Sequence, residues 1–280
     1  MKNSGMEISV LIPCYEMHGT LFSLLESLQQ GFAPEIQEIL VCCDGCKTEC
    51  RFPTGGEIPV RHLKREENRG LSYTRNELLS HCQTEGFWFL DADTMPDSSC
   101  REILQKFSGE TLTAGQEATA PILTDWDFYR FHFFRQTFGE KALEEVPFCM
   151  GLCFLGTKSL LGEKRFSLEL VSHGEDLDLS YRLRKQGVGI CYEPDLRVCH
   201  QRKDSFRSFC RMVFLHGYWQ ARMMKRHKEK TWPLFSAQFR WFGISFASLI
   251  FRHKKTGLAL LSPVLNGLSL GAKVWGWFRE

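Results

Sequence analysis

Two acidic motifs contain the residue types most able to support chemistry. Asp91-Ala92-Asp93 places two carboxylates one residue apart directly after an apolar run, and Glu175-Asp176 places two more in a later acidic segment. Two carboxylates at the end of a buried strand can hold Mg²⁺ or Mn²⁺, hard cations that prefer oxygen ligands and share them with substrate phosphates. An Asp-x-Asp pattern is also ordinary turn chemistry, and an acidic pair is common at a helix start. The elements around the motifs must decide between these interpretations.

The first third of the chain has the spacing of alternating strands and helices. Short apolar runs predict strands over residues 8–12, 36–43, 60–63 and 87–90. Residues 72–81 predict one helix, and another has one apolar face and should end at Gly31. That face comprises Leu21, Leu24, Leu25 and Leu28. Strand, helix and strand at this spacing predict an α/β domain with right-handed crossovers.

The loops after these strands hold polar residues that the fold should bring together. Ligands of open α/β sheets bind beyond the carboxyl ends of the strands. We therefore expect residues 13–16, Asp44 and Asp91–Asp93 to line one crevice. Residues 173–184 alternate as a strand would, but acidic residues at their start, basic residues at their end and Gly187 just after them favour a helix.

Five segments in this order carry a resemblance to a known family. They are ISVLIPCY (residues 8–15), VCCDG (41–45), NRGLSYTRN (68–76), LDAD (90–93) and GEDLDL (174–179). Together they resemble the family 2 glycosyltransferases of the GT-A fold, over about residues 6–200. The resemblance implies a Rossmann-like mixed sheet flanked by helices, a UDP- or GDP-activated sugar donor, Mg²⁺ or Mn²⁺, and transfer to an acceptor hydroxyl with inversion.

The resemblance also implies which residues bind the donor. The nucleoside residues would be Pro13, Tyr15, Glu16 and Asp44; the segment closing over base and diphosphate would contribute Asn68, Gly70 and Arg75; the metal-diphosphate motif would be Asp91, Ala92 and Asp93. An Asp can accept the imide N–H of uracil, a Tyr can stack on a base, and an Arg can bind a phosphate through two donors. Arg75 could instead be a solvated helix arginine. Cys46 departs from the family, in which a small hydroxyl residue often follows the Asp-Gly pair.

On the acceptor side, the resemblance makes Asp176 the general base and Glu175 the second choice. The base would deprotonate the acceptor hydroxyl opposite the leaving diphosphate. His200, at the end of a short strand predicted over residues 198–200, resembles the histidine that completes the metal site with Asp91 and Asp93. A lone histidine is also often structural, so both interpretations stay open.

Two other functions compete with glycosyl transfer. A sugar nucleotidyltransferase also uses a βαβ sheet and a metal carboxylate, but it needs a Gly-rich basic loop after the first strand. The sequence has Pro13-Cys14-Tyr15-Glu16 there. A membrane scaffold that kept the fold without its chemistry would not need Asp93 and Asp176.

The chain has 12 cysteines, and four of them crowd together as Cys42, Cys43, Cys46 and Cys50. The Cys43-x-x-Cys46 spacing is compatible with a zinc or redox site, but no second cysteine or histidine pair follows at the spacing of a zinc finger. We favour reduced thiols at the end of a strand and in its loop. Without a secretory pattern before Ile8, the cysteine content predicts a cytoplasmic protein.

The two ends of the sequence differ in charge. Residues 1–199 carry a net charge of −10 and residues 200–280 one of +12. This predicts a catalytic domain over residues 1–204 and a basic, aromatic-rich helical extension over residues 205–280. The acidic domain disfavours nucleic acid, so we expect the extension to meet an anionic membrane at its cytoplasmic face, with a soluble helix pair as the alternative.

Within the extension, residues 257–272 are uncharged but contain Pro263 and Asn266. These residues should break the segment before it reaches the roughly 20 apolar residues of a spanning helix. We therefore expect it to lie in the interface or to re-enter, with Trp275 and Trp277 at headgroup level and the Arg252-His-Lys-Lys255 cluster on anionic lipid.

Overall fold

The computed structural model describes residues 6–16, 18–48, 52–53, 55–118, 122–171, 173–228 and 247–279. The chain divides into two compact units. The sheet unit comprises residues 1–120 and 136–202, and the helical unit comprises residues 121–135 and 203–280. The predicted boundary between residues 204 and 205 stays a prediction.

The sheet unit is built on one mixed eight-stranded sheet with the order β3-β2-β1-β4-β7-β6-β8-β5. Strands β3, β2, β1 and β4 are parallel, and β7 is antiparallel to both β4 and β6. The strands are β1 Ile8–Cys14, β2 Ile36–Asp44, β3 Val60–Arg65, β4 Gly86–Leu90, β5 Thr94–Pro96, β6 Leu112–Ala118, β7 Cys153–Thr157 and β8 Ile190–His200. This is the mixed α/β sheet expected of a GT-A fold.

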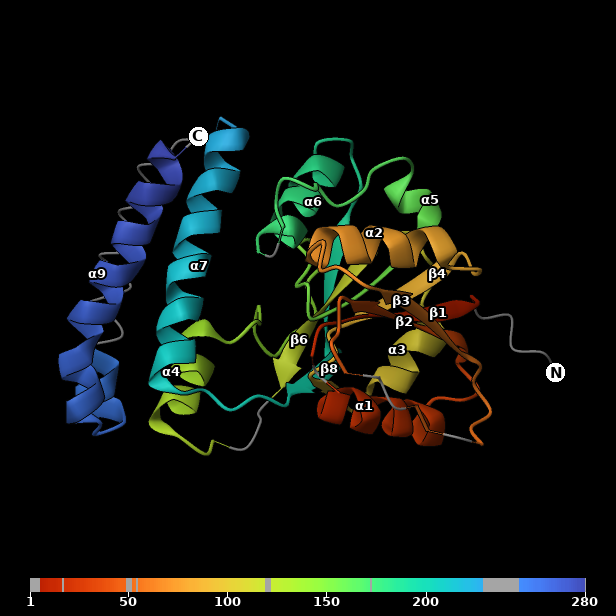
Figure 1. The fold of residues 1–280 in the computed structure, drawn as a ribbon, viewed down its shortest axis with the longest axis horizontal. Helices are drawn as coiled ribbons and strands as arrows, with labels where there is room; N and C mark the ends of the chain where they lie inside the picture. The colour runs from red at the N-terminus through yellow and green to blue at the C-terminus, as the bar shows by residue number, and fades with distance from the viewer. Residues whose placement is uncertain are drawn as a thin grey trace. The chain divides into compact units, whose positions relative to one another are not determined.

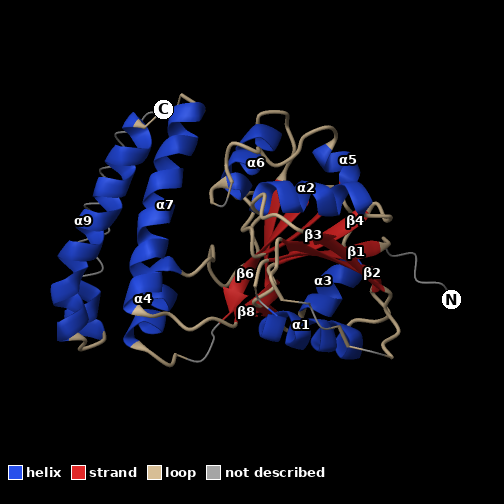
Figure 2. Cartoon of the chain, viewed as in Figure 1, coloured by secondary structure: helices blue, strands red, loops and turns tan. Residues whose placement is uncertain are grey.

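Helices cover both faces of this sheet. Figure 1 shows α1 and α3 against one face and α2, α5 and α6 against the other. Their bounds are α1 His18–Gly31, α2 Leu71–His81, α3 Cys100–Lys106, α5 Lys158–Leu161 and α6 Glu175–Arg184. Figure 2 shows the same layers by element type, with the strands in red between the helices.

The alternation of side chains along each strand fills two apolar layers. Val10 and Ile12 of β1 pack with the leucines of α1, whereas Leu11 packs with Leu78 of α2. The four predicted α1 leucines have no exposed surface. The predictions of these strands, of both early helices and of a helix rather than a strand at residues 173–184 are confirmed.

The helical unit contains α4 Asp125–Phe134, α7 Phe206–Arg226, the π-helical turn η1 Ser248–Arg252 and α9 Thr256–Phe278. Its core joins all four elements through Tyr129, Phe209, Leu249 and Leu258. A buried ion pair at 2.8 Å between Arg130 Nε and Asp204 Oδ2 links α4 to the start of α7.

The expected break at Pro263 and Asn266 is wrong, because α9 runs without interruption through both residues. Asn266 Nδ2 donates to the Ser262 carbonyl at 2.8 Å, so the asparagine side chain bonds within the helix and does not end it. A proline removes one N–H from a helix, and here packing of α9 on α7 compensates. Among the described residues, α9 is the one helix long and apolar enough to cross a membrane by length and composition.

Candidate active site

The parallel strands bring distant loops to one edge of the sheet. Cys14 at the end of β1 lies opposite Cys43 of β2, and β4 runs parallel to β1 on its other side. Asp44 therefore ends β2 near the start of the loop that follows β1, and Asp91 follows β4 directly. The elements of the predicted crevice share this edge.

Arg75 of α2 lies at the centre of the site and is 1% exposed. Its Nη1 donates to Glu175 Oε1 at 2.5 Å, and its Nη2 donates to Asp91 Oδ1 at 3.0 Å. Burial lowers the pKa of Arg75, but the negative charges of Glu175 and Asp91 raise it above its ordinary value, so the guanidinium is charged. Arg75 is thus no solvated helix arginine. It joins Asp91 of the predicted metal motif to Glu175 of the predicted acceptor motif, although Glu175 lies 100 residues from Arg75 in the sequence.

Gly151 connects the same groups from the loop before β7, and nothing in the sequence pattern pointed to it. Its carbonyl accepts from Arg75 Nη2 at 2.8 Å, and its N–H donates to Asp176 Oδ2 at 2.9 Å. A Cβ atom at this position would lie 3.0 Å from both Arg75 Nη atoms and from Asp176 Oδ2. Only a residue without a side chain leaves these contacts undistorted.

The two acceptor-side carboxylates differ in environment. Glu175 is 4% exposed and bonded to Arg75, whereas Asp176 is partly exposed. Burial and the neighbouring Asp176 raise the pKa of Glu175, although Arg75 opposes the shift. The oxygens of Asp176 accept the N–H groups of Gly151 and Leu177 at 2.9 and 2.8 Å, which fixes the carboxylate at the start of α6. Of the pair, Asp176 is the more exposed to solvent.

Asp93, the second carboxylate of the predicted metal motif, lies against His200, the last residue of β8. His200 Nε2 lies 3.0 Å from Asp93 Oδ2, and Nδ1 lies 3.5 Å from Glu117 Oε1. Burial lowers the pKa of His200, but Asp93 and Glu117 raise it to about 9. Burial raises the pKa of Asp93, but the hydrogen bond and charge of His200 lower it on balance. Glu117, which lies in β6 and is 1% exposed, carries no sequence motif that predicts this contact.

These residues fit a divalent cation by their chemistry. Asp91 and Asp93 offer carboxylate oxygens and His200 an imidazole nitrogen, the ligand types that Mg²⁺ and Mn²⁺ take in proteins. Burial raises the pKa of Asp91, Arg75 opposes that shift, and Asp93 reinforces it. A cation would stabilise the ionised form of two carboxylates that repel each other. His200 must release its proton before its nitrogen can bind a cation.

Asp44 holds the loop before α2 in the structure. Its oxygens accept the N–H groups of Arg69 and Gly70, each at 2.8 Å, and Arg65 Nη2 lies 3.2 Å away. Gly70 has φ 94°, and a Cβ there would lie 2.3 Å from Val171 Cγ1, so glycine is required. The nucleoside contact predicted for Asp44 stays a prediction. Its partner Arg65 belongs to none of the sequence motifs.

The remaining residues predicted to bind the donor lie at or just after the ends of β1, β3 and β4. Pro13 is buried, whereas Tyr15 is 48% exposed and its ring is accessible to a stacking partner. Glu16 has φ 55°, and its Oε1 accepts the Lys47 N–H at 2.8 Å, which joins the two loops. Asn68 Oδ1 accepts the Gly70 N–H at 3.1 Å. Ala92 is buried between the two aspartates.

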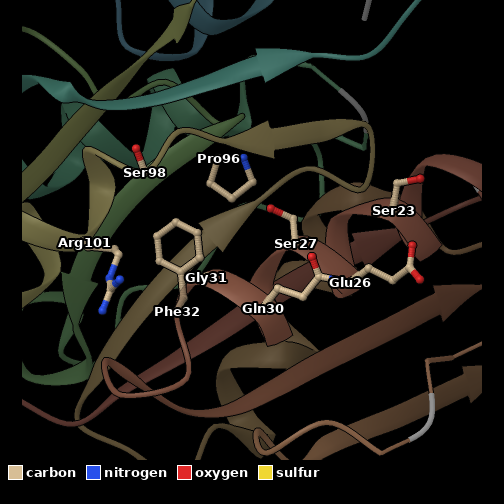
Figure 3. Close-up of a pocket in the computed structure, with 9 residues that line it drawn as sticks. All are labelled: Ser23, Glu26, Ser27, Gln30, Gly31, Phe32, Pro96, Ser98 and Arg101. Carbon is tan, nitrogen blue, oxygen red and sulfur yellow. The ribbon is translucent and has the colours of Figure 1, made fainter.

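A separate groove lies between α1 and the segment from β5 to α3. Figure 3 shows Phe32 and Pro96 at its apolar side, with Ser27, Gln30 and Arg101 around them. None of the predicted donor or acceptor residues lines it. It holds no paired carboxylates and takes no part in the site described above.

The family of the chain follows from its match to a family model. The model described as "Glycosyltransferase like family 2" matches residues 5–242. The chain belongs to glycosyltransferase family 2. The ordered motifs and the GT-A architecture thus agree with the family assignment.

The relatives found by sequence and by structure are remote. The pre-mycofactocin glycosyltransferase of Mycobacterium tuberculosis is 23% identical over 285 residues, which cover 97% of this chain and 58% of that protein. The chain thus spans less than three-fifths of this relative's length. A mannosyltransferase from Pyrobaculum calidifontis, in complex with GDP-Man and Mn²⁺, has a TM-score of 0.65 at 13% identity and covers 100% of this chain and 89% of that one. TarS of S. aureus with UDP-GlcNAc has a TM-score of 0.54 at 15% identity, covering 97% and 89%.

Proposed function

We propose that this glycosyltransferase transfers a sugar from a UDP- or GDP-activated donor to an acceptor hydroxyl, with inversion and with Mg²⁺ or Mn²⁺. The observation that carries the proposal is the contact of Arg75 with both Asp91 and Glu175. This contact places the predicted metal motif and the predicted acceptor motif on one buried cation. A donor diphosphate at the predicted metal motif and an acceptor at the predicted acceptor motif would then meet between the two motifs.

Each carboxylate has one task in this proposal. Asp176 takes the proton of the acceptor hydroxyl, the hydroxyl oxygen forms the new bond to the anomeric carbon, and the bond from that carbon to the leaving phosphate oxygen breaks. Gly151 and Leu177 orient the Asp176 carboxylate by their N–H groups. Arg75 positions Glu175 and Asp91 and is too buried to move far. When bound at Asp91 and Asp93, a divalent cation would neutralise the charge of the leaving diphosphate.

The donor class rests on the relatives and on the exposed ring of Tyr15. Of the structural neighbours, the mannosyltransferase is in complex with GDP-Man and Mn²⁺, and TarS is in complex with UDP-GlcNAc. Tyr15 offers its exposed ring to a base, and residues 68–70 follow on the same edge. These features support a nucleoside-diphosphate sugar and leave the choice between uridine and guanosine to experiment.

A thermal-shift panel tests the donor proposal. UDP-, GDP- and dTDP-sugars are compared with and without Mn²⁺, since a ligand at 100 times its dissociation constant adds about 2.7 kcal/mol to stability. One nucleotide should stabilise the protein, and only with the metal. Absence of any metal-dependent shift across the panel would refute the proposal.

The competing functions give different results. A nucleotidyltransferase would bind a nucleoside triphosphate together with a sugar phosphate, and an inactive scaffold would bind a donor without consuming it. Incubation of the stabilising donor with Mn²⁺ therefore separates them, because transfer or slow hydrolysis releases the nucleoside diphosphate. The buried network around Arg75 favours turnover, since a scaffold has no use for two aligned acidic motifs.

The helical unit supports the proposal of an anionic membrane as partner. Exposed residues of α9 from Gly257 to Phe278 are all uncharged, and the largest are Leu260, Val264, Val274, Trp275 and Phe278. Arg252 and Lys254 are exposed just before this helix. An apolar helix face next to basic residues fits the boundary between headgroups and acyl chains.

One residue of the predicted basic cluster has another task. Lys255 Nζ lies 2.6 Å from Asp125 Oδ1 and 5.2 Å from the centre of the Phe128 ring, so it holds the start of α9 to α4. We therefore assign lipid contact to Arg252 and Lys254 only. Cosedimentation with anionic vesicles at low salt tests the proposal, and protein that stays in the supernatant would contradict it.

A further inference from the structure

Cys14 and two of the crowded cysteines, Cys43 and Cys46, meet at the predicted nucleoside edge. Cys14 ends β1, Cys43 lies opposite it in β2, and Cys46 follows the turn after Asp44. Their three sulfur atoms all lie within 4.8 Å of one another. The crowded cysteines of the sequence are therefore regrouped by the fold, since Cys14 joins from another strand.

Strand alternation explains which cysteines belong together. Cys14 and Cys43 point to the face covered by α1, and Cys46 packs against the same core. Cys42 points to the opposite face, where Arg65 Nη2 lies 3.6 Å from its sulfur. Cys50 lies outside the described residues.

The spacing of the sulfurs suits a metal ion better than unrelated packing. A Zn–S bond of about 2.3 Å in a tetrahedral site places sulfurs about 3.8 Å apart, so three sulfurs within 4.8 Å need only a small contraction. Cys14 and Cys43 are 3% and 1% exposed, whereas Cys46 is partly exposed, which gives an ion a route of entry.

We propose that Cys14, Cys43 and Cys46 bind one thiophilic d¹⁰ cation of the Zn²⁺ class as three thiolates, with water as the fourth ligand. Each thiol releases its proton to solvent, so three protons leave for each divalent cation bound. The bound ion would tie the loop that carries Tyr15 and Glu16 to the loop that carries Lys47. This site is chemically distinct from Asp91 and Asp93, because soft ions select thiolates and Mn²⁺ selects oxygen.

The test uses the full-length protein, reduced and freed of metal, and titrates it with Cd²⁺. Cadmium thiolates absorb in the near ultraviolet through sulfur-to-metal charge transfer, and the band should saturate at one equivalent. Loss of a residue that only hydrogen-bonds to a metal ligand typically lowers metal affinity 10- to 100-fold. Loss of a ligand itself, in Cys46→Ser, should therefore weaken Cd²⁺ binding by at least about 10²-fold. The matched control is Cys210→Ser in α7, a partly exposed thiol outside the cluster, which should bind as the native protein does.

Further arms separate the other outcomes. Asp93→Ala should leave the Cd²⁺ band unchanged, so failure of the donor proposal and failure of this one are distinguishable. X-ray absorption of the zinc-loaded protein should give three sulfur neighbours. The proposal is overturned if no saturable band forms, if Cys46→Ser keeps the native affinity, or if two of the three thiols are found oxidised to a disulfide. Equal loss in Cys46→Ser and Cys210→Ser would also overturn it, since scattered thiols would then bind the ion.

Discussion

The sheet unit and the helical unit differ in what they bury. In the sheet unit the buried cation Arg75 is held by two carboxylates and a carbonyl. In the helical unit α7 and α9 meet through small residues: a Cβ at Gly217 would lie 2.7 Å from the Ser269 carbonyl, and one at Gly276 would lie 2.3 Å from that of Tyr218. The first pattern fixes the positions of charged groups, and the second brings two backbones close together. Substitutions should therefore affect turnover in one unit and helix packing or surface binding in the other.

The largest effect is expected at the acceptor base. Asp176→Asn removes the proton acceptor but keeps the size of the side chain, so turnover should fall by about 10²–10⁴-fold while donor affinity stays nearly native. Initial rates and donor titrations on the same preparation measure both. Glu175→Gln is the comparison: if it loses as much turnover while Asp176→Asn loses none, the wrong carboxylate is assigned.

A large stability effect is expected from Arg75→Met. Removal of one partner leaves Glu175 buried without its counter-ion, which commonly costs about 3–5 kcal/mol. Urea unfolding measures the loss. The control is Arg184→Met, since its pair with Glu145 is at the surface, with side chains 40% and 70% exposed, and such pairs contribute up to about 1 kcal/mol. If both variants lose the same free energy of unfolding, the Arg75 network is no more stabilising than an ordinary surface ion pair.

Asp93→Ala should abolish the metal-dependent part of donor binding. The native protein gains about 2.7 kcal/mol at 100 times the dissociation constant of its donor, and the variant should show no Mn²⁺-dependent gain. Thermal shifts with and without Mn²⁺ give the comparison. Glu102→Ala, an exposed carboxylate of α3, should behave as the native protein does. A full Mn²⁺-dependent shift in Asp93→Ala would place the metal elsewhere.

Much of the sheet unit could be predicted because its signals are local. The spacing of apolar residues within a short stretch of sequence predicts three of its elements. These are the strand at residues 8–12, the leucine face of α1 and the helix at residues 72–81. Gly151, Glu117 and Arg65 could not be found in this way. Their roles come from contacts with residues far away in sequence, as between Gly151 and Arg75, and their surroundings in the sequence are ordinary.

The helical unit was less predictable because packing overrides local preference. Pro263 and Asn266 are poor helix residues, yet α9 continues through them against α7. The grouping of α4 with α7 and α9 also depends on distant contacts, such as that between Arg130 and Asp204. A distant contact also explains why Cys14 lies beside Cys43 and Cys46 in the sheet unit. The pairing of β1 with β2 brings Cys14 opposite Cys43.

A moderate effect is expected at the membrane surface. Arg252→Gln with Lys254→Gln should weaken binding to anionic vesicles by on the order of 10-fold, since each basic residue contributes roughly 1 kcal/mol before salt screening. Some binding should remain at high salt through the apolar face of α9. Lys106→Gln with Lys141→Gln removes the same charge from exposed positions of the sheet unit and is the control. An equal loss in the control would indicate a general charge effect rather than a binding face.

A pH-dependent effect on stability is expected at Lys273, which is 5% exposed in α9. Burial lowers the pKa of Lys273 to about 8 from the ordinary 10.5. Below pH 8 the side chain is charged in both the folded and the unfolded chain, and burial of the charge opposes folding. Between pH 8 and 10.5 the folded chain releases the proton and the unfolded chain keeps it, so stability should rise with pH in this window, by less than about 1.4 kcal/mol for each pH unit.

Lys273→Met should be more stable than the native protein at pH 7 and should lack this part of the rise, whereas Lys225→Met, at an exposed position of α7, should keep it. Urea unfolding at pH 7, 8 and 9.5 gives the slopes, and an unchanged slope in Lys273→Met would show that Lys273 is not the group that titrates.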